Sequence, residues 1–282
     1  MRFFFLIGMM IGVLTAFYVF LAMAAFSQDF AMLINTSVVA VLKDVVGPVS
    51  AGFGGAIAGA YSAYYLQLKS ERNKERKSDF SVVHKTTIQL SQKYSELISL
   101  KKHNIYPYKD SKIRFLEIPK LPAKCGVDER VDTNVVDVLL SVGAVSAIDV
   151  IVLADSRYRA CFENFESRNK SIDDYRAVLQ KSKFSFDEDV DFRDIVSVVE
   201  PGRLIALNEI TELMLDVLDE TLVSLREAVG LISTALDPKY KGSGTKTFKM
   251  NFSGHDEYFK KMPAPFFNRE RLRDFLHASR AV

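Results

Sequence analysis

The chain has 282 residues and a net charge of +2, with 48% hydrophobic and 26% charged residues. This small, balanced charge excludes the strong positive field typical of nucleic-acid-binding proteins, so no nucleic-acid partner is expected. Charged residues are nevertheless sparse up to residue 68 and frequent from Lys69 onward. This division predicts an N-terminal part embedded in a membrane and a larger part in water.

The N-terminal stretch is uncharged from Phe3 to Phe26. A run of about 24 residues is longer than the apolar core of a signal peptide, which has about 7–15 residues, and it is long enough to cross a bilayer. We therefore predict a first membrane span at residues 3–26. A cleaved signal peptide is the alternative, because Ala22 and Ala24 form a small-residue pattern that resembles a cleavage site.

A second uncharged stretch, residues 45–68, contains Gly47 and Pro48, and proline suits the first turn of a helix. Basic residues gather directly after it, as is typical of the cytoplasmic side of a membrane. We assign topology and lipid headgroup contact to Lys69, Arg72, Lys74, Arg76 and Lys77. The two spans predict a transmembrane hairpin, residues 1–68, in a bacterial-type inner membrane with both termini in the cytoplasm.

Small residues recur every four positions in both predicted spans. In lipid, such stripes let helix backbones approach closely, so we predict that they pack the spans together and join copies of the chain into a homo-oligomer. The members are Gly8, Gly12 and Ala16 in the first span, and Ala51, Gly55, Gly59 and Ala63 in the second. A parallel stripe beside the second set, Gly52, Ala56 and Ala60, offers a further face.

The rest of the chain predicts a cytosolic helical domain. Residues 69–104 predict a juxtamembrane basic helix, with apolar positions at Val83, Leu90, Tyr94 and Leu97 and a potential restart at Ser78 and Asp79. Residues 105–126 contain three prolines and predict an irregular connection. Residues 127–240 predict the domain core, and residues 241–282 a polar tail with a short basic helix at 268–280.

Within the core, a helical pattern runs from Asp128 through Gly143 to about Arg168, and Ser171 favours the start of a shorter second helix. The strongest pattern begins at Pro201 and continues to about Leu236. Asp237 and Pro238 are expected to end it. Its apolar positions predict the backbone of a helical bundle: Leu204, Leu207, Met214, Leu218, Leu225, Val229 and Ile232.

The acidic segment before that helix resembles part of a calcium loop, because Asp187, Asp189 and Asp191 stand at the spacing of its first ligands. Phe192 and Val198 occupy the positions that require Gly and Glu, so an acidic linker with a helix cap is favoured and no metal is expected.

Other candidate motifs also favour structural roles. The sequence GSGTK at residues 242–246 lacks the spacing of a phosphate-binding loop. Asp149 and Asp155 stand among apolar residues, where nearby Arg157 and Arg159 favour structural ion pairs over catalysis. The four histidines stand far apart, and the two cysteines, Cys125 and Cys161, are expected to be reduced and unpaired. We predict no catalytic residue and no cofactor.

The predicted fold is all-α, with a transmembrane hairpin followed by a long-helix bundle. This architecture favours a membrane protein that oligomerises through its spans and uses the cytosolic helices to bind a protein partner or to sense a signal. The alternative is a pore-forming or membrane-disrupting effector gated by the cytosolic domain. In class, though not in any motif, the arrangement resembles the two-span membrane effectors of bacterial defence systems.

Overall fold

The computed structural model describes residues 9, 12–13, 15–20, 22–23, 27, 40–182, 191–240 and 250–280. The chain divides into two compact units, Met1–Arg76 and Lys77–Val282, called unit 1 and unit 2 below. Throughout the described ranges the regular structure is helical, which confirms the predicted all-α class. Most of the predicted first span, Gly8 included, lies outside the described residues.

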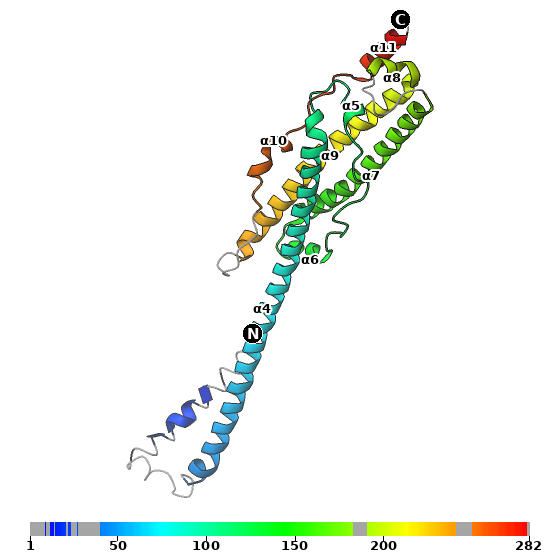
Figure 1. Cartoon of the computed structure of the whole chain (residues 1–282). Helices are drawn as coiled ribbons and strands as arrows, with labels where there is room; N and C mark the ends of the chain where they lie inside the picture. The colour runs from blue at the N-terminus through cyan, green and yellow to red at the C-terminus, as the bar shows by residue number, and fades with distance from the viewer. Residues whose placement is uncertain are drawn as a thin grey trace. The chain divides into compact units, whose positions relative to one another are not determined.

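The second predicted span belongs to α4, Gly47–Leu100, which follows the π-helical turn η1, Leu42–Val46 (Figure 1). The helix continues through Ser78 and Asp79, so the restart expected there does not occur. Good helix formers precede both positions and no Gly or Pro lies near them, so helical hydrogen bonding is not interrupted. None of the helices in the described ranges is both long enough and apolar enough to cross a bilayer.

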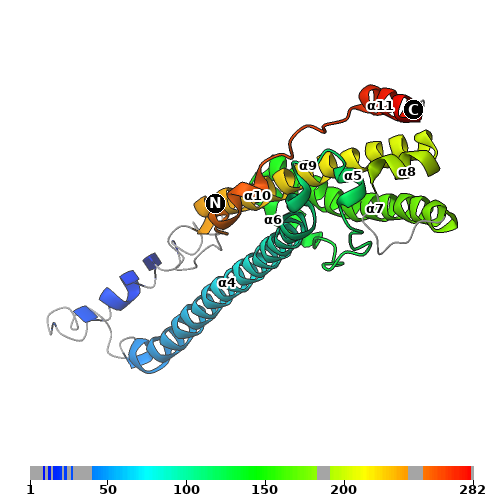
Figure 2. The ribbon, with the colours of Figure 1, turned by 45° about the horizontal axis from the view of Figure 1, so that its top comes forward.

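Unit 2 is built around the C-terminal part of α4, α7 at Val145–Lys181 and α9 at Pro201–Tyr240. Figures 1 and 2 show α7 and α9 side by side, and these two helices make the most extensive contact in the unit. Their apolar stripes enclose a core with the predicted apolar residues of α4, namely Val83, Leu90, Tyr94 and Leu97. Short helical turns connect the long helices: η3 (Tyr106–Tyr108), α5 (Arg114–Glu117), η4 (Ser253–His255) and α10 (Asp256–Phe259).

Helix α9 confirms the strongest sequence prediction. Pro201 lies in its first turn, and the predicted apolar positions follow one another at three, four or seven residues on one face, which places them in the core. The buried side chains include Leu204, Leu207, Met214, Leu218, Leu225, Val229 and Ile232. The helix continues to Tyr240, so the end expected at Asp237 and Pro238 was placed one turn too early.

The helix expected from Asp128 to Arg168 is in fact divided at Gly143. Helix α6, Asn134–Ser141, ends there because Gly143 adopts a φ of 73°, which glycine reaches without steric cost. The amides of Gly143 and Ala144 donate to the carbonyls of Leu140 and Leu139 at 3.0 and 2.9 Å, the two hydrogen bonds of a Schellman motif.

The second helix expected from Ser171 does not exist as a separate element, because α7 continues through it to Lys181. The Ser171 hydroxyl donates to the carbonyl of Ser167 at 3.3 Å, one turn earlier in the same helix, and does not cap a helix start.

Arg168 of α7 fixes the path of the irregular connection, residues 105–126. Its buried guanidinium donates to the carbonyls of Phe115, Ile118 and Pro119 at 3.3, 2.6 and 3.0 Å. Its Nε donates to the Thr211 hydroxyl of α9 at 3.0 Å. These partners carry no negative charge, and desolvation lowers the pKa of Arg168 to about 10.

Lys101 fastens the C-terminal segment to the bundle. This residue begins the π-helical turn η2, Lys101–Ile105, and its buried ammonium donates to the carboxylate of Asp219 on α9. It also donates to the carbonyl of Lys260 at 2.7 Å, and the amide of Met262 donates to the other Asp219 oxygen at 2.7 Å. Desolvation lowers the pKa of Lys101, while its hydrogen bond to Asp219 acts in the opposite direction.

A second, smaller core lies where α8, Phe192–Val198, and α11, Arg269–Arg280, pack with α9. Leu272 and Leu276 of α11 are buried in it. Arg280 donates from Nε and Nη2 to the carbonyls of Val196 and Val199 at 3.0 and 2.7 Å. Helix α11 confirms the short basic helix predicted near the C-terminus.

Candidate functional site

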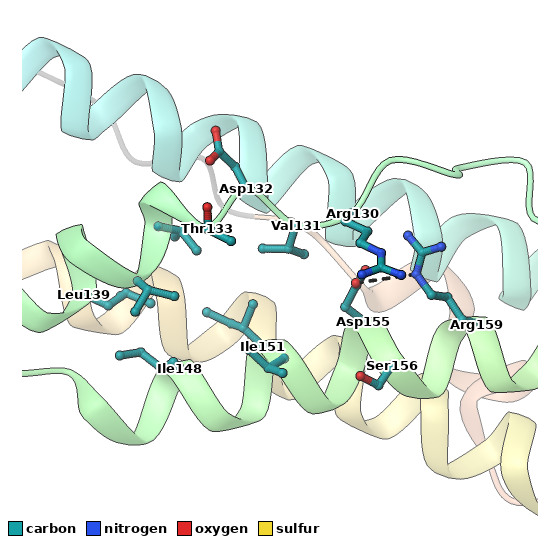
Figure 3. A pocket seen from close by; sticks show the side chains of 13 residues that line it. Arg130, Val131, Asp132, Thr133, Leu139, Ile148, Ile151, Asp155, Ser156 and Arg159 are labelled. Carbon is teal, nitrogen blue, oxygen red and sulfur yellow. Dashed lines mark ion pairs between the residues drawn. The ribbon is translucent and has the colours of Figure 1, made fainter.

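A cavity of about 300 Å³ opens in unit 2 between α6, α7 and the segment 130–133 that precedes α6. Its volume is at the lower end of the range of small-molecule binding sites. Figure 3 shows Leu139 and Ile148 toward one end of the cavity and Arg130, Asp155 and Arg159 at the other. The cavity therefore has an apolar end and a charged end.

One face of α7 forms the longer wall of the cavity. The lining residues recur every three or four positions, as neighbours on a helix surface do: Ile148, Ile151, Val152, Asp155, Ser156 and Arg159. Along this face the side chains change from aliphatic to polar and charged within about 16 Å, at 1.5 Å per residue. The opposite wall is also apolar, with Val131, Val135, Val136 and Leu139.

Lys93 of α4 compensates the charge of Asp155. The Lys93 ammonium is completely buried, donates to the Asp155 carboxylate, and also donates to the carbonyl of Glu129 at 2.9 Å. It lies 5.1 Å from the centroid of the Tyr158 ring, within the range of a cation–π contact. Asp155 lines the cavity, whereas Lys93 does not. The carboxylate that faces the cavity is therefore already neutralised by an ammonium behind it.

Arg159 has hydrogen-bonding capacity left over at the charged end. Its Nη2 donates to the carbonyl of Asp128 at 2.9 Å, and its Nη1 lies 3.4 Å from a carboxylate oxygen of the same residue. Its Nε lies 3.8 Å from Asp155 Oδ2, which is beyond hydrogen-bond distance. This buried Nε is therefore an unsatisfied donor.

Arg130 is exposed at the same end, and its guanidinium has no ion-pair or hydrogen-bond partner among the described residues. Asp132 supplies the remaining charge in the lining. Its carboxylate accepts from the amide of Asn134, the first residue of α6, at 2.9 Å, and Figure 3 shows it directed away from α7.

Glu96 of α4 anchors the chain just before this segment. One carboxylate oxygen accepts from the amide of Gly126 at 2.8 Å, and the other accepts from the Tyr158 hydroxyl. Burial and this hydrogen bond raise the pKa of Tyr158. A Cβ at Gly126 would lie 2.7 Å from Glu96 Oε1, so only glycine fits without displacing the carboxylate.

The small-residue stripes predicted in the spans have open surroundings. A Cβ placed on Gly12, Gly52, Gly55 or Gly59 would meet no heavy atom within 4 Å. Ala16, Ala51 and Ala63 are exposed as well. Within unit 1, the hydroxyl of Tyr18 lies 3.5 Å from Ser50 Oγ, an exposed hydrogen bond at the limit of the usual distance. The predicted close packing between spans stays a prediction.

The predicted headgroup residues, Lys69, Arg72, Lys74, Arg76 and Lys77, are all exposed on α4. Their side chains are thus available for contacts outside the helix, as the prediction requires.

The other residues considered from sequence mostly have structural roles. Asp149 is exposed, whereas Asp155 has the predicted partner Arg159 and the unpredicted partner Lys93. Arg157 instead pairs with Glu220 at 3.2 Å. Asp191 accepts from the amide of Arg193 at 3.1 Å and caps α8, which confirms the expected helix cap.

Neither Cys125 nor Cys161 forms a disulfide. Asp187, Asp189 and the GSGTK motif lie outside the described residues, and the described ranges contain no group of His, Cys, Asp and Glu side chains able to hold a metal ion.

Neither Arg130 nor the cavity as a whole was predicted from the sequence. A signal was present in α7, where aliphatic residues give way to charged ones at helical spacing from Ile148 to Arg159. The signal was incomplete, because the opposite wall depends on the turn at Gly143 that folds α6 back onto α7.

Comparisons of the chain with family models, with curated proteins and with solved structures gave no match.

Proposed function

We propose that the chain is an integral membrane protein that self-associates through its small-residue helices and uses unit 2 to bind a ligand or partner. The observation that carries this proposal is the surface of α4 between Val49 and Leu66. This stretch has no charged side chain, and its large apolar side chains are exposed: Val49, Phe53, Ile57, Tyr61, Tyr64, Tyr65 and Leu66.

Exposure of this kind is costly in water, and a lipid or protein environment removes the cost. The order of residues favours lipid. Val49, Phe53 and Ile57 come first, then the tyrosines at 61, 64 and 65, then the basic residues from Lys69 onward. Membrane helices place tyrosine at the interface and basic residues just beyond it on the cytoplasmic side.

Glycine, serine and tyrosine make the stretch only mildly apolar, so lipid burial alone would hold it weakly. The open glycine stripe supplies a second source of stability. Helices that pack through small residues gain van der Waals contact and close backbone approach, which makes self-association the expected state of such a span.

Membrane insertion is tested with the full chain expressed in bacteria. The protein should remain in the membrane fraction after alkaline carbonate washing. Reporter fusions after Lys77 and Val282 should report the cytoplasm, and a fusion near Asn35 the outside. Release by carbonate, or an external C-terminus, would refute the proposal.

Self-association is tested by combining Gly55→Leu with Gly59→Leu. The larger side chains should separate the helices and lower the oligomer population at least tenfold in a membrane association assay, without loss of insertion. Leu66→Ala, outside the stripe, serves as the control. An unchanged oligomer would exclude the stripe as an interface between copies.

A pore-forming effector is the second candidate, and the parallel stripe favours it. Gly52 is as open as Gly55 and Gly59, so α4 offers two small-residue faces, and two faces permit a closed ring of copies. Induced expression should then release a dye from loaded cells, and the combined glycine variant should abolish release. Harmless expression without dye release would exclude the pore-forming role, and only the binding role would remain.

A further inference from the structure

We infer that the cavity between α6 and α7 binds a small amphiphilic carboxylic acid, with its apolar body between the two helices and its carboxylate at Arg130 and Arg159. The inference deepens the ligand-binding role proposed above for unit 2 and rests on it for its biological purpose. The cavity itself lies wholly within unit 2, so binding does not depend on the membrane assignment.

The size of the cavity limits the ligand. A volume of about 300 Å³ accommodates roughly ten water-sized groups, taking about 30 Å³ for each. The lining face of α7 is about 16 Å long at 1.5 Å per residue, so an elongated molecule fits it better than a compact one. A medium-chain acid has the required size and shape.

The apolar end favours a hydrocarbon body. Val135, Leu139 and Ile151 form a buried floor, and Ile148 and Val152 continue it toward the surface. Val152 is 53% exposed, so it leaves water-accessible aliphatic surface that a ligand chain would cover. Covering such surface is favourable at about 25 cal/mol per Å².

The charged end favours an anionic head. Asp155 is neutralised by Lys93, and Asp132 is engaged by the start of α6, so neither carboxylate needs the arginines as its only partner. Arg130 has a free guanidinium, and Arg159 has an unsatisfied Nε. A carboxylate is the small group that guanidinium binds best, through charge-assisted and often bidentate hydrogen bonds.

The same arrangement disfavours other small ligands. An amine would face the exposed guanidinium of Arg130, while the carboxylates of Asp155 and Asp132 already have partners, and would be repelled. A neutral alcohol of equal length would fill the apolar end but leave Arg130 without an anionic partner. Selectivity for an acid over the matched alcohol is therefore the property that defines this site.

The test uses the full chain in lipid nanodiscs and an octanoate probe with a photoreactive diazirine at its methyl end. After irradiation, mass spectrometry should locate the label within residues 130–139 and 145–159. Unlabelled octanoate should compete with the probe, and octanol should compete at least tenfold more weakly. Empty nanodiscs measure the share of probe that partitions into lipid.

Two pairs of matched variants test the two ends of the site. Arg130→Gln should weaken probe binding about tenfold, whereas Lys124→Gln, a nearby exposed residue outside the lining, should not change it. Val152→Asp should abolish labelling because it places a charge on the apolar wall. Leu153→Asp, on the adjacent exposed position of α7, should leave labelling intact. Both Asp variants concern exposed positions, and equal melting temperatures would verify that they fold.

Labelling spread evenly over the chain, equal competition by octanol, or full binding by Arg130→Gln would each overturn the inference. These results are independent of the fate of the membrane proposal. A chain released by carbonate that still labels at the cavity would refute only the membrane role, and an inserted chain without specific labelling would refute only the ligand.

Discussion

The two ends of α4 present opposite chemistry to their surroundings. Between Val49 and Leu66 the helix exposes aromatic and aliphatic side chains, with Tyr64 and Leu66 63% and 64% exposed. From Val83 the same helix enters the core of unit 2, where the ammonium of Lys93 is completely buried, as is that of Lys101 in η2 directly after the helix. The helix thus exposes its apolar residues at one end and buries a charge at the other.

The difference shows what each end requires from its environment. A buried ammonium is tolerated only with a carboxylate and further acceptors, and both lysines have them: Asp155 with the Glu129 carbonyl, and Asp219 with the Lys260 carbonyl. The apolar side chains between Val49 and Leu66 are exposed instead of packed in a core. A lipid or protein surface would remove the cost of this exposure in water, which is why the membrane proposal concerns this end alone.

The largest effect should come from placing the same charge in each end. Leu97→Asp introduces an unpaired carboxylate at a completely buried position and should lower the free energy of unfolding by about 4–5 kcal/mol. Ile57→Asp changes an exposed position and should alter that free energy by less than about 0.5 kcal/mol. Urea denaturation of the full chain, followed by the circular dichroism of its helices, measures both.

The same pair of variants separates stability from membrane association. Ile57→Asp should reduce the membrane-bound fraction, since a charge at the centre of a span costs about 3 kcal/mol on insertion scales. Equal destabilisation of unit 2 by both variants would contradict the contrast between the two ends. An unchanged membrane fraction in Ile57→Asp would show that this surface does not contact lipid.

A slightly smaller effect should follow from removing a partner of a buried lysine. Asp219→Ala leaves the Lys101 ammonium buried and unpaired and should cost about 3–4 kcal/mol. In the double variant Lys101→Met with Asp219→Leu, both charges are gone, and much of the stability should return. A double variant no more stable than Asp219→Ala would show that the loss arises from the released segment at Met262, which Asp219 also holds.

Gly126→Ala should have a moderate effect of about 1–3 kcal/mol. The added methyl group would lie 2.7 Å from Glu96 Oε1, so the carboxylate must move and give up its hydrogen bonds to the Gly126 amide and the Tyr158 hydroxyl. Thermal melting of the purified chain measures the cost. Gly202→Ala is the control, because a Cβ there meets no atom within 4 Å.

The helices were predictable where local pattern and tertiary packing agree. In α9, Pro201 and the spacing of the leucines are sufficient, because the face that repeats in sequence is the face that is buried. The break at Gly143 was missed because α6 and α7 both continue an apolar pattern across it. Glycine is tolerated inside a helix, and only its positive φ in the fold shows that it ends one.

The charged groups of the core could not be predicted either, and the reason is a different one. In sequence, Lys93 and Lys101 look like ordinary exposed lysines of a basic helix. Their partners Asp155 and Asp219 are 62 and 118 positions away along the chain, so no local pattern connects them. The cavity could not be predicted from a local pattern either, because its two walls meet only after α6 folds back onto α7.

The smallest predicted effect concerns Cys161, a core residue of α7 whose thiol lies 3.2 Å from Thr221 Oγ1 on α9. Burial raises the pKa of the Cys161 thiol from 9.0 to about 12, so the fold favours the neutral form. This stabilisation is fully present below pH 9 and is lost as the pH rises toward 12, because the unfolded chain gives up the thiol proton first. Between pH 8 and pH 10 the loss should be about 1 kcal/mol.

The destabilisation caused by Cys161→Ala should therefore be about 1 kcal/mol smaller at pH 10 than at pH 8, as measured by urea denaturation at each pH. Other groups that titrate in this range contribute equally to both chains and cancel. A destabilisation that does not change with pH would mean that the thiol ionises as easily in the folded chain as in the unfolded one, contrary to its burial.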